Sequence, residues 1–291
     1  MKILSVTAFS AICLSSTSWS QEPAPVPPKT FETPIDAADA FIDAAKKGET
    51  PALLEIFGDQ YKEMIGTTEP ERDRELRAKV AAMAVERRRF RFDAENSVTM
   101  VIGAEAWPFP IPIVKAGESW HFDTGEGIQE VVNRRVGENE LSAMTSMKAY
   151  FDAQSAYVLE SRDESGVRKY ATRFISSPGK KDGLYWPADS APAGPAIKDA
   201  ETPLDGYHFK ILTAQGEAAP GGKYDYMVNG NFIGGFAMIA WPNDYRKTGV
   251  MTFIVNHYGD IYEADLGPDT AKLAAAVTEY NPGDAWALSE E

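Results

Sequence analysis

Apolar residues near the start of the chain recur at helical spacing. The apolar positions between 35 and 45 lie three or four residues apart, and Thr33-Pro34 before them offers a cap with proline in the first turn. The same capping signal, at Thr50-Pro51, precedes a shorter apolar stretch. A third helical pattern covers about 70–89. The sequence therefore predicts three helices in this region.

The period of the pattern changes after residue 89. Apolar and polar residues alternate from Phe90 to Ile102 and again from Trp120 to Phe122, as in antiparallel strands. The segment from Trp107 to Pro112 contains three prolines, each of which removes a donor from a sheet, so we expect an edge or irregular segment there. Helices followed by a curved antiparallel sheet predict an α+β unit over residues 32–124.

Helical spacing returns from 126 to 157, where Gly137 predicts a break or a kink, and a further helix is predicted over about 168–175. Residues 176–206 are rich in Pro, Gly, Ser and Ala, which predicts a long surface loop with a small ordered part at Leu184-Tyr185-Trp186. The strands predicted after this loop are 207–212, 224–228, 232–240, 250–256 and 260–263, with a helix from about 268 to 277. This pattern predicts a second α+β unit, a long helix with an antiparallel sheet, over residues 125–291.

The composition is that of a globular protein, with 44% hydrophobic and 25% charged residues. Lys and Arg total 29 against 43 Asp and Glu, which gives a formal charge of −14. A negative field of this size repels phosphate backbones, so nucleic acid is not an expected partner.

The first twenty residues have the layout of a secretory signal. Lys2 precedes an apolar stretch from Ile3 to Leu14, and small and polar residues follow up to Ser20, after which we expect cleavage. No later segment has 18 consecutive apolar residues, so we expect no transmembrane segment in the mature chain and a periplasmic location. Cys13, the only cysteine, lies in the signal, and the prolines of 21–31 predict an extended tether.

Four strings along the chain are distinctive: Trp107-Pro-Phe-Pro-Ile-Pro112, Arg134-Arg-Val-Gly-Glu-Asn-Glu140, Asp182-Gly-Leu-Tyr-Trp-Pro187 and Gly249-Val-Met-Thr-Phe-Ile-Val255. In this order they resemble the strings of a bacterial exported family known as domain of unknown function 2950. The resemblance covers nearly the whole mature chain. It implies export but supplies no activity.

Two further resemblances concern the fold. The segment from Asn139 through Tyr157, with Ala240-Trp241-Pro242 and Gly259-Asp260-Ile261 downstream, is similar to the globular heads of type IV pilin-like and pseudopilin proteins. In those proteins an apolar stem precedes the helix, and here none does, so the resemblance implies a head without its stem. The first unit resembles the cone of nuclear-transport-factor-2-like and cystatin-like domains, a fold that hosts enzymes, binders and scaffolds.

Candidate chemistry is sparse, and the sequence predicts no complete catalytic set, no metal site and no cofactor motif. His121 and Asp123 lie two residues apart on a predicted strand and so share a face, which would suit a base with its orienting group or two metal ligands. No third ligand occurs at local spacing. Half-exposed strand residues explain the same pattern.

Aromatic residues in proline-bounded segments form a second candidate group. Trp107, Phe109, Tyr185 and Trp186 would suit a binding surface for glycans or peptides, but large aromatic side chains usually finish buried, so we favour plugs that hold irregular loops onto the two units. A third group, near the predicted helix break, suggests an ion-paired structural junction between the units rather than paired catalytic carboxylates; its members are Arg134, Arg135, Asn139 and Glu140.

Two functional hypotheses follow. The first is a non-enzymatic scaffold or interaction module of the cell envelope, whose partner is another envelope protein. The alternative is a small-ligand binder or hydrolase that uses a pocket in the first unit with His121 and Asp123 at its mouth.

Overall fold

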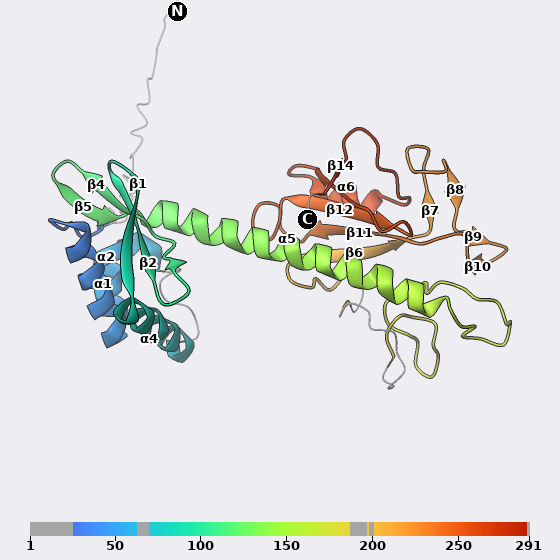
Figure 1. Cartoon of the computed structure of the whole chain (residues 1–291), viewed down its shortest axis with the longest axis horizontal. Helices are drawn as coiled ribbons and strands as arrows, with labels where there is room; N and C mark the ends of the chain where they lie inside the picture. Colours follow the sequence, from blue (N-terminus) through green and yellow to red (C-terminus); the bar gives the residue numbers. More distant parts are fainter. Residues whose placement is uncertain (1–25, 63–69, 187–196, 198–200, 290–291) are drawn as a thin grey trace, which may run out of the picture. The chain divides into compact units, whose positions relative to one another are not determined.

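The computed structural model describes residues 26–62, 70–186, 197 and 201–289 of the chain. Two compact units are present, one ending at Thr124 and the other beginning at Gly125 (Figure 1). Both combine helices with antiparallel sheets, which confirms the predicted α+β class. The predicted signal, 1–20, lies outside the described residues, as does the start of the predicted tether, 21–25.

The helices of the first unit begin and end at the predicted signals. Thr33 and Asp36 form a capping box, in which the Asp36 N–H donates to the Thr33 side chain and the Thr33 N–H donates to the Asp36 carboxylate. Gly48 ends the first helix in the left-handed conformation, with a φ of 68°. The elements are α1 (Pro34–Lys47), α2 (Thr50–Phe57), the 3-10 helix η1 (Asp59–Tyr61) and α4 (Pro70–Glu86).

The first sheet has the strand order β1-β2-β4-β5, with β3 also paired to β2. Val98, Met100 and Ile102 of β2 are fully buried while their neighbours are half-exposed, as the alternation predicts. The proline-rich segment from Trp107 joins the sheet for only two residues, because proline cannot supply a ladder donor. The strands are β1 (Arg88–Ala94), β2 (Ser97–Ile102), β3 (Trp107–Pro108), β4 (Ile113–Ala116) and β5 (Ser119–Phe122).

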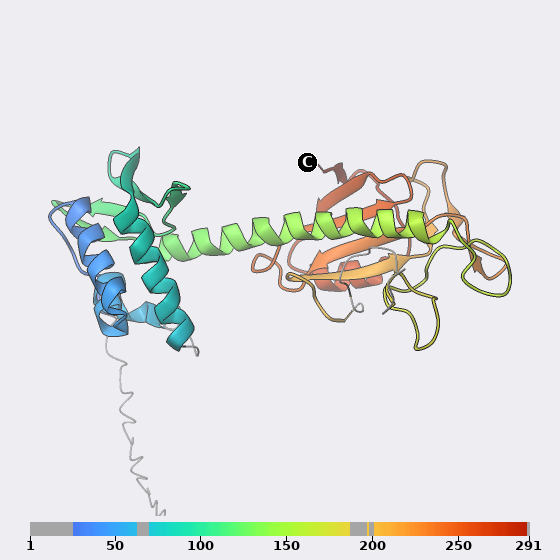
Figure 2. The ribbon, with the colours of Figure 1, turned by 60° about the horizontal axis from the view of Figure 1, so that its bottom comes forward.

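The core of the first unit lies between its helices and one face of its sheet. Figure 2 shows the helices grouped on one side of the strands. Phe41 of α1 meets Phe109 and Phe122 with ring centroids 4.7 and 6.0 Å apart, and Phe57 of α2 completes the aromatic cluster. These rings belong to the one cluster of buried residues that forms the core of this unit.

The second unit is organised around one long helix, α5 (Thr124–Tyr157), which is continuous over 34 residues. The predicted break at Gly137 is therefore wrong. A glycine in a helix interior costs about 1 kcal/mol relative to alanine, which packing along so long a helix easily offsets. The buried face of α5 repeats at three- and four-residue spacing through Ala143, Met147, Tyr150, Ala153, Gln154 and Tyr157.

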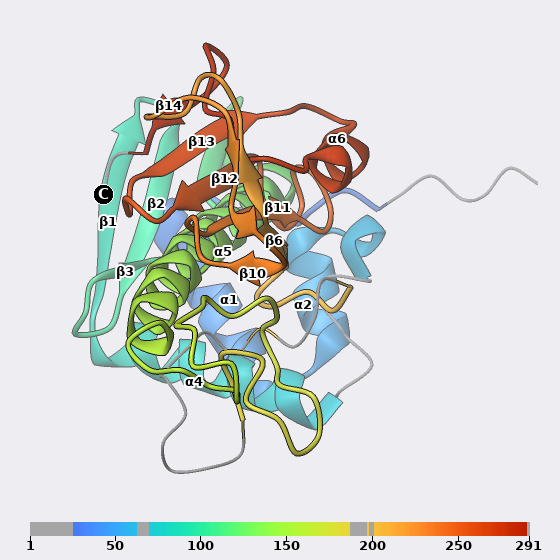
Figure 3. The same ribbon diagram turned by 90° about the vertical axis from the view of Figure 1, so that its right-hand side faces the viewer.

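The main sheet of the second unit has the order β14-β13-β12-β11-β6, antiparallel throughout. The interior strand β11, which pairs with β12 on one side and β6 on the other, is buried at all six positions, because helices cover both faces of the sheet (Figure 3). Tyr150 of α5 donates to the Ala237 carbonyl on β11, and Lys210 of β6 donates to the Ala275 carbonyl of α6 (Thr270–Ala276). The strands are β6 (Tyr207–Leu212), β11 (Ala237–Pro242), β12 (Met251–Asn256), β13 (Ile261–Asp265) and β14 (Ala287–Leu288).

Two predicted strands are each divided in the structure. The N–H groups of Ile233 and Gly234 both donate to the Tyr226 carbonyl, which takes this stretch out of the main sheet. Gly235 follows with a φ of 148°, where a Cβ would lie 2.7 Å from Nδ1 of His257. The resulting short strands pair as β7 (Ala214–Gln215) with β8 (Tyr224–Asp225), and as β9 (Met227–Val228) with β10 (Asn231–Phe232).

The predicted helix over 168–175 is absent, and this segment is an extended loop. Its backbone groups are used elsewhere: the Tyr170 N–H donates to the Phe232 carbonyl. The buried Gln154 side chain accepts from the Ala171 N–H and donates to the Ala171 carbonyl, both at 2.8 Å. These partners replace the hydrogen bonds that a helix would have made.

We expect Gln154→Leu to destabilise the second unit by about 2–4 kcal/mol, because it leaves the buried N–H and carbonyl of Ala171 without partners. Urea unfolding followed by circular dichroism would measure the loss. The matched control is Gln129→Leu, which removes an exposed hydrogen bond to Asn133 on the same helix and should change the unfolding midpoint little. Equal midpoints for the two variants would contradict this role of Gln154.

Candidate functional site

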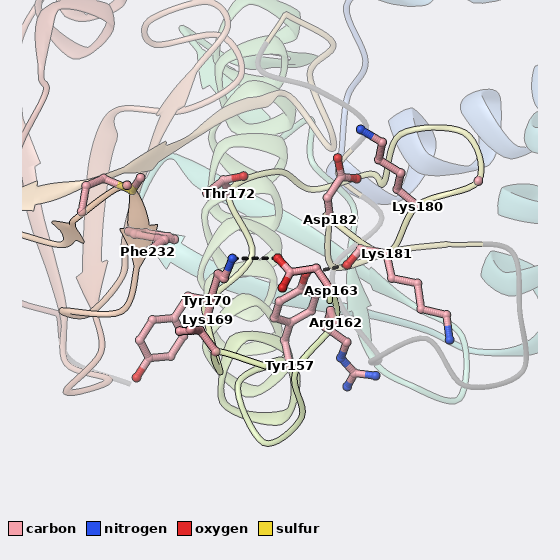
Figure 4. Close-up of a pocket in the computed structure, with 14 residues that line it drawn as sticks. Tyr157, Arg162, Asp163, Lys169, Tyr170, Thr172, Lys180, Lys181, Asp182 and Phe232 are labelled. Carbon is pink, nitrogen blue, oxygen red and sulfur yellow. Dashed lines mark hydrogen bonds and ion pairs between the residues drawn. The ribbon is translucent and has the colours of Figure 1, made fainter. Parts of the chain in front are cut away.

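A cavity of about 680 Å³ lies in the second unit, where α5 ends. We call it the loop pocket, because most of its walls come from the connection that follows α5 (Figure 4). Its lining residues are Tyr157, Arg162, Asp163, Val167, Lys169, Tyr170, Thr172, Gly179, Lys180, Lys181, Asp182, Met227, Gly230 and Phe232.

Backbone hydrogen bonds fix the two sides of the loop pocket. Tyr157, at the end of α5, donates from its hydroxyl to the Lys181 carbonyl at 2.5 Å. On the other side the Tyr170 N–H donates to the Phe232 carbonyl of β10, and the two rings meet edge to face with centroids 6.1 Å apart. The helix end and the β9–β10 hairpin therefore hold the loop from opposite sides.

A charge pair crosses the loop pocket between Asp163 and Lys169, whose carboxylate oxygen and Nζ lie 2.7 Å apart (Figure 4). The Asp163 carboxylate also accepts from the Ser165 N–H at 2.9 Å and from the Ser165 hydroxyl. The hydrogen bond from Lys169, followed by those from Ser165, lowers the pKa of Asp163 to about 2. This carboxylate stays ionised at any physiological pH.

A second carboxylate, Asp182, closes the loop from Ser177 to Lys181. It accepts from the Ser177 N–H at 2.7 Å and from the Ser177 hydroxyl at 2.8 Å. Burial raises the pKa of Asp182, but the Ser177 hydrogen bonds outweigh that effect and lower it. Both carboxylates of the loop pocket are thus already occupied by protein donors.

The cations of the loop pocket outnumber its carboxylates. Arg162, Lys169, Lys180 and Lys181 line it, against Asp163 and Asp182. The pocket is therefore locally positive, whereas the chain as a whole has a formal charge of −14. The arrangement suits binding of a polar or anionic group beside the rings of Tyr157, Tyr170 and Phe232.

The aromatic residues singled out in the sequence lie in both units. Phe109 is buried in the first core, and Trp107 is half-buried with its ring centroid 6.2 Å from that of Phe109. In the second unit Trp186 is only 4% exposed, whereas its neighbour Tyr185 is 52% exposed. Phe109 and Trp186 are buried, as expected of side chains that hold loops onto a core. Of the four aromatic residues, Tyr185 is the one that is more than half exposed to solvent.

His121 lies in β5 and Asp123 follows the last residue of that strand, Phe122; both are half-buried. His121 pairs with Val114 across the sheet, on the face opposite to the buried Ile113 and Phe122. A cavity of about 670 Å³ in the first unit includes neither residue; it is lined by Asp39, Ile42, Asp43, Lys46 and residues 84–88. Among the described residues, no group of three or more His, Cys, Asp or Glu has metal-site geometry.

Two of the four proposed junction residues, Asn139 and Glu140, attach α5 to the sheet of its own unit. Asn139 donates to the Thr248 carbonyl at 2.8 Å, and the Glu140 carboxylate accepts from the N–H groups of Val250 and Met251 at 2.8 and 3.0 Å. Arg134 pairs with Glu130, one turn earlier on α5, at 2.8 Å, and Arg135 is exposed. The sequence predicted that Glu140 would form an ion pair at a junction between the units. In the structure its carboxylate instead accepts hydrogen bonds from backbone N–H groups where the β11–β12 connection enters β12.

The glycine between these contacts has no room for a side chain. A Cβ at Gly249 would lie 2.1 Å from the Tyr207 hydroxyl, which itself donates to the Met251 carbonyl at 2.9 Å. Burial, and then the nearby Glu140 carboxylate, raise the pKa of Tyr207. The phenol is thus held protonated as a donor.

Sequence reasoning missed the loop pocket. The stretch that contains Arg162, Asp163, Lys169 and Lys181 has no clear period, and the sequence predicts a helix over part of it, 168–175. A usable signal was present in the alternating charges around Gly166, between two predicted elements.

Comparison with known proteins gives one match. The family model described as "Protein of unknown function (DUF2950)" matches residues 28–288. No curated protein and no solved structure matches significantly. The similarities to pilin-like heads and to nuclear-transport-factor-2-like cones therefore stay predictions.

The pKa of Asp163 gives a prediction for the loop. Because its folded-state pKa lies below the ordinary value of 3.8, the contribution of this carboxylate to loop order is complete above pH 3.8 and is lost as the pH falls through about 2. NMR titration of the Asp163 carboxyl carbon would measure this pKa. In Lys169→Met the strongest lowering contact is gone, so the pKa should rise toward 3.8; an unchanged pKa in that variant would show that Lys169 does not set it.

Proposed function

Since this chain belongs to the DUF2950 family, whose function is unknown, we propose a function from its own residues. We propose an exported, non-enzymatic interaction module of the bacterial envelope. Its second unit holds a ligand or a segment of a partner in the loop pocket. The first unit then serves as a scaffold.

The single observation that carries this proposal is the composition of the loop pocket. Its carboxylates are fully engaged by lysine, serine and backbone donors, so they serve to order the walls. The hydroxyl of Thr172 and the ammonium of Lys180 have no partner among the described residues and remain available to a bound group. A pocket with ordered walls and available polar groups is typical of binding sites.

Export is supported by the signal layout at residues 1–20. Among the helices in the described part of the chain, none has the length and apolar character needed to cross a bilayer. The alternative function, a hydrolase or binder that uses a pocket of the first unit with His121 and Asp123 at its mouth, gains no support from the cavity described in that unit, because other residues line it.

Photo-crosslinking in living cells tests the proposal. A benzoylphenylalanine at Val167, which lines the loop pocket and is 36% exposed, should form a crosslinked product in the envelope fraction. The matched control is the same amino acid at Leu273 on α6, which is 47% exposed and lies outside the pocket. Equal crosslinking at both positions, or none at either, would count against the loop pocket as the contact surface.

Export has its own test. Mass spectrometry of the protein from a periplasmic extract should give a chain that begins at Gln21. Ile12→Asp places a charge in the apolar stretch of the signal and should leave the full-length chain in the cytoplasm. Processing of this variant to the same mature chain would argue against a secretory signal at residues 1–20.

A further inference from the structure

Two positive side chains at the loop pocket share one indole ring. The Arg162 guanidinium carbon lies 5.5 Å from the centroid of Trp186, and the Lys181 Nζ lies 5.6 Å from the same ring. The Arg162 guanidinium carbon also lies 5.4 Å from the ring of Tyr157. We call these four residues the Trp186 cluster.

The positions of the cluster are set before any ligand arrives. Trp186 is 4% exposed, and the Tyr157 hydroxyl holds the Lys181 carbonyl. Packing against the Tyr157 and Trp186 rings leaves the Arg162 side chain 16% exposed. A guanidinium fixed in this way loses little rotamer freedom on binding, which favours affinity.

The cluster carries more positive than negative charge. Glu160 pairs with Arg162 at 2.8 Å, but its side chain is 70% exposed, and pairs of that kind are weak. Lys181 has no ion pair among the described residues. One of the two cations is thus left for an external anion.

Two N–H groups of the cluster are also unsatisfied. Among the described residues, Nε of Arg162 and Nε1 of Trp186 are buried and have no hydrogen-bond partner. Native proteins rarely leave buried donors in this state. Both atoms are closed to solvent in this conformation, so an anion would first contact the ammonium of Lys181 and the guanidinium beside it, which lie over the same ring.

We propose that the Trp186 cluster binds an oxyanion, a phosphate or carboxylate group carried by the ligand of the loop pocket. Guanidinium recognises such groups through paired N–H donors, and the ammonium adds a point charge. Figure 4 shows the ends of Arg162 and Lys181 in the same part of the view, away from the end of Lys180. Met227, Tyr170 and Phe232 provide an apolar wall for the body of that ligand.

This inference rests on the proposed function, because it names the chemistry of that ligand. The test uses the mature chain, residues 21–291, and follows the indole N–H of Trp186 by ¹⁵N NMR, assigned with Trp186→Phe. Inorganic phosphate and acetate are titrated separately against potassium chloride at equal ionic strength. Phosphate, acetate or both should shift the Trp186 signal saturably, and the comparison between them identifies the preferred oxyanion.

Three variants complete the test. Arg162→Gln should weaken the apparent Kd about tenfold or more, as expected for loss of a charge-assisted hydrogen bond. Arg162→Lys keeps the charge but loses the paired donors, so its apparent Kd should lie between those of the parent and of Arg162→Gln. It also serves as a check in case the Gln variant misfolds. The matched control is Arg246→Gln, which removes another arginine that stacks on a tyrosine ring, Tyr245, in the same unit; it should bind as the parent does.

An equal shift with chloride, no shift with either oxyanion, or parental binding by both Arg162 variants would overturn the inference. The crosslinking at Val167 is independent of this result. Crosslinking without anion binding would retain the proposed function and reject the oxyanion. Anion binding without crosslinking would show an anion site at the Trp186 cluster but would reject the loop pocket as the contact surface for a partner, and with it the link between the two proposals.

Discussion

One buried amide connects the parts of the second unit on which the loop pocket depends. The side chain of Gln154 donates to the Tyr150 hydroxyl and to the Ala171 carbonyl, and accepts from the Ala171 N–H. Tyr150 in turn donates to the Ala237 carbonyl of β11. A single turn of α5 thereby joins the sheet to the loop that forms the pocket walls. Because these groups are buried, each has to be satisfied inside the protein, and this requirement fixes an otherwise irregular segment in one conformation.

Regular elements were predictable wherever burial repeats along the sequence. The alternation of Val98, Met100 and Ile102 specified β2, and the Thr33-Pro34 cap specified the start of α1. Sequence reasoning failed where a distant partner outweighs local preference. Gly137 did not break α5, and the stretch over 168–175 became a loop, because Gln154 and Phe232 supply its hydrogen bonds.

The candidate site was harder to predict than the fold for a related reason. A loop pocket has no period, so the sequence of Arg162, Asp163 and Lys169 does not reveal that the loop turns back and places Lys181 beside Trp186. The aromatic string around Trp186 was recognised, but its role depends on which cations reach the ring. His121 and Asp123 showed the opposite case: the local pattern was clear, but His121 lies on the sheet face opposite to Phe122, Asp123 follows the strand, and neither residue lines the cavity bounded by Asp39 and Ile42.

The attachment of α5 to the β11–β12 connection restricts the sequence there. Asn139, Glu140 and Tyr207 contact the backbone of residues 248–251, so these contacts tolerate most exchanges of side chains in the connection itself. Gly249 is the exception, because the phenol ring of Tyr207 occupies the space where its Cβ would be. Even the smallest side chain at that position would push the ring off the Met251 carbonyl. A tyrosine on another strand thus decides which amino acid this turn accepts.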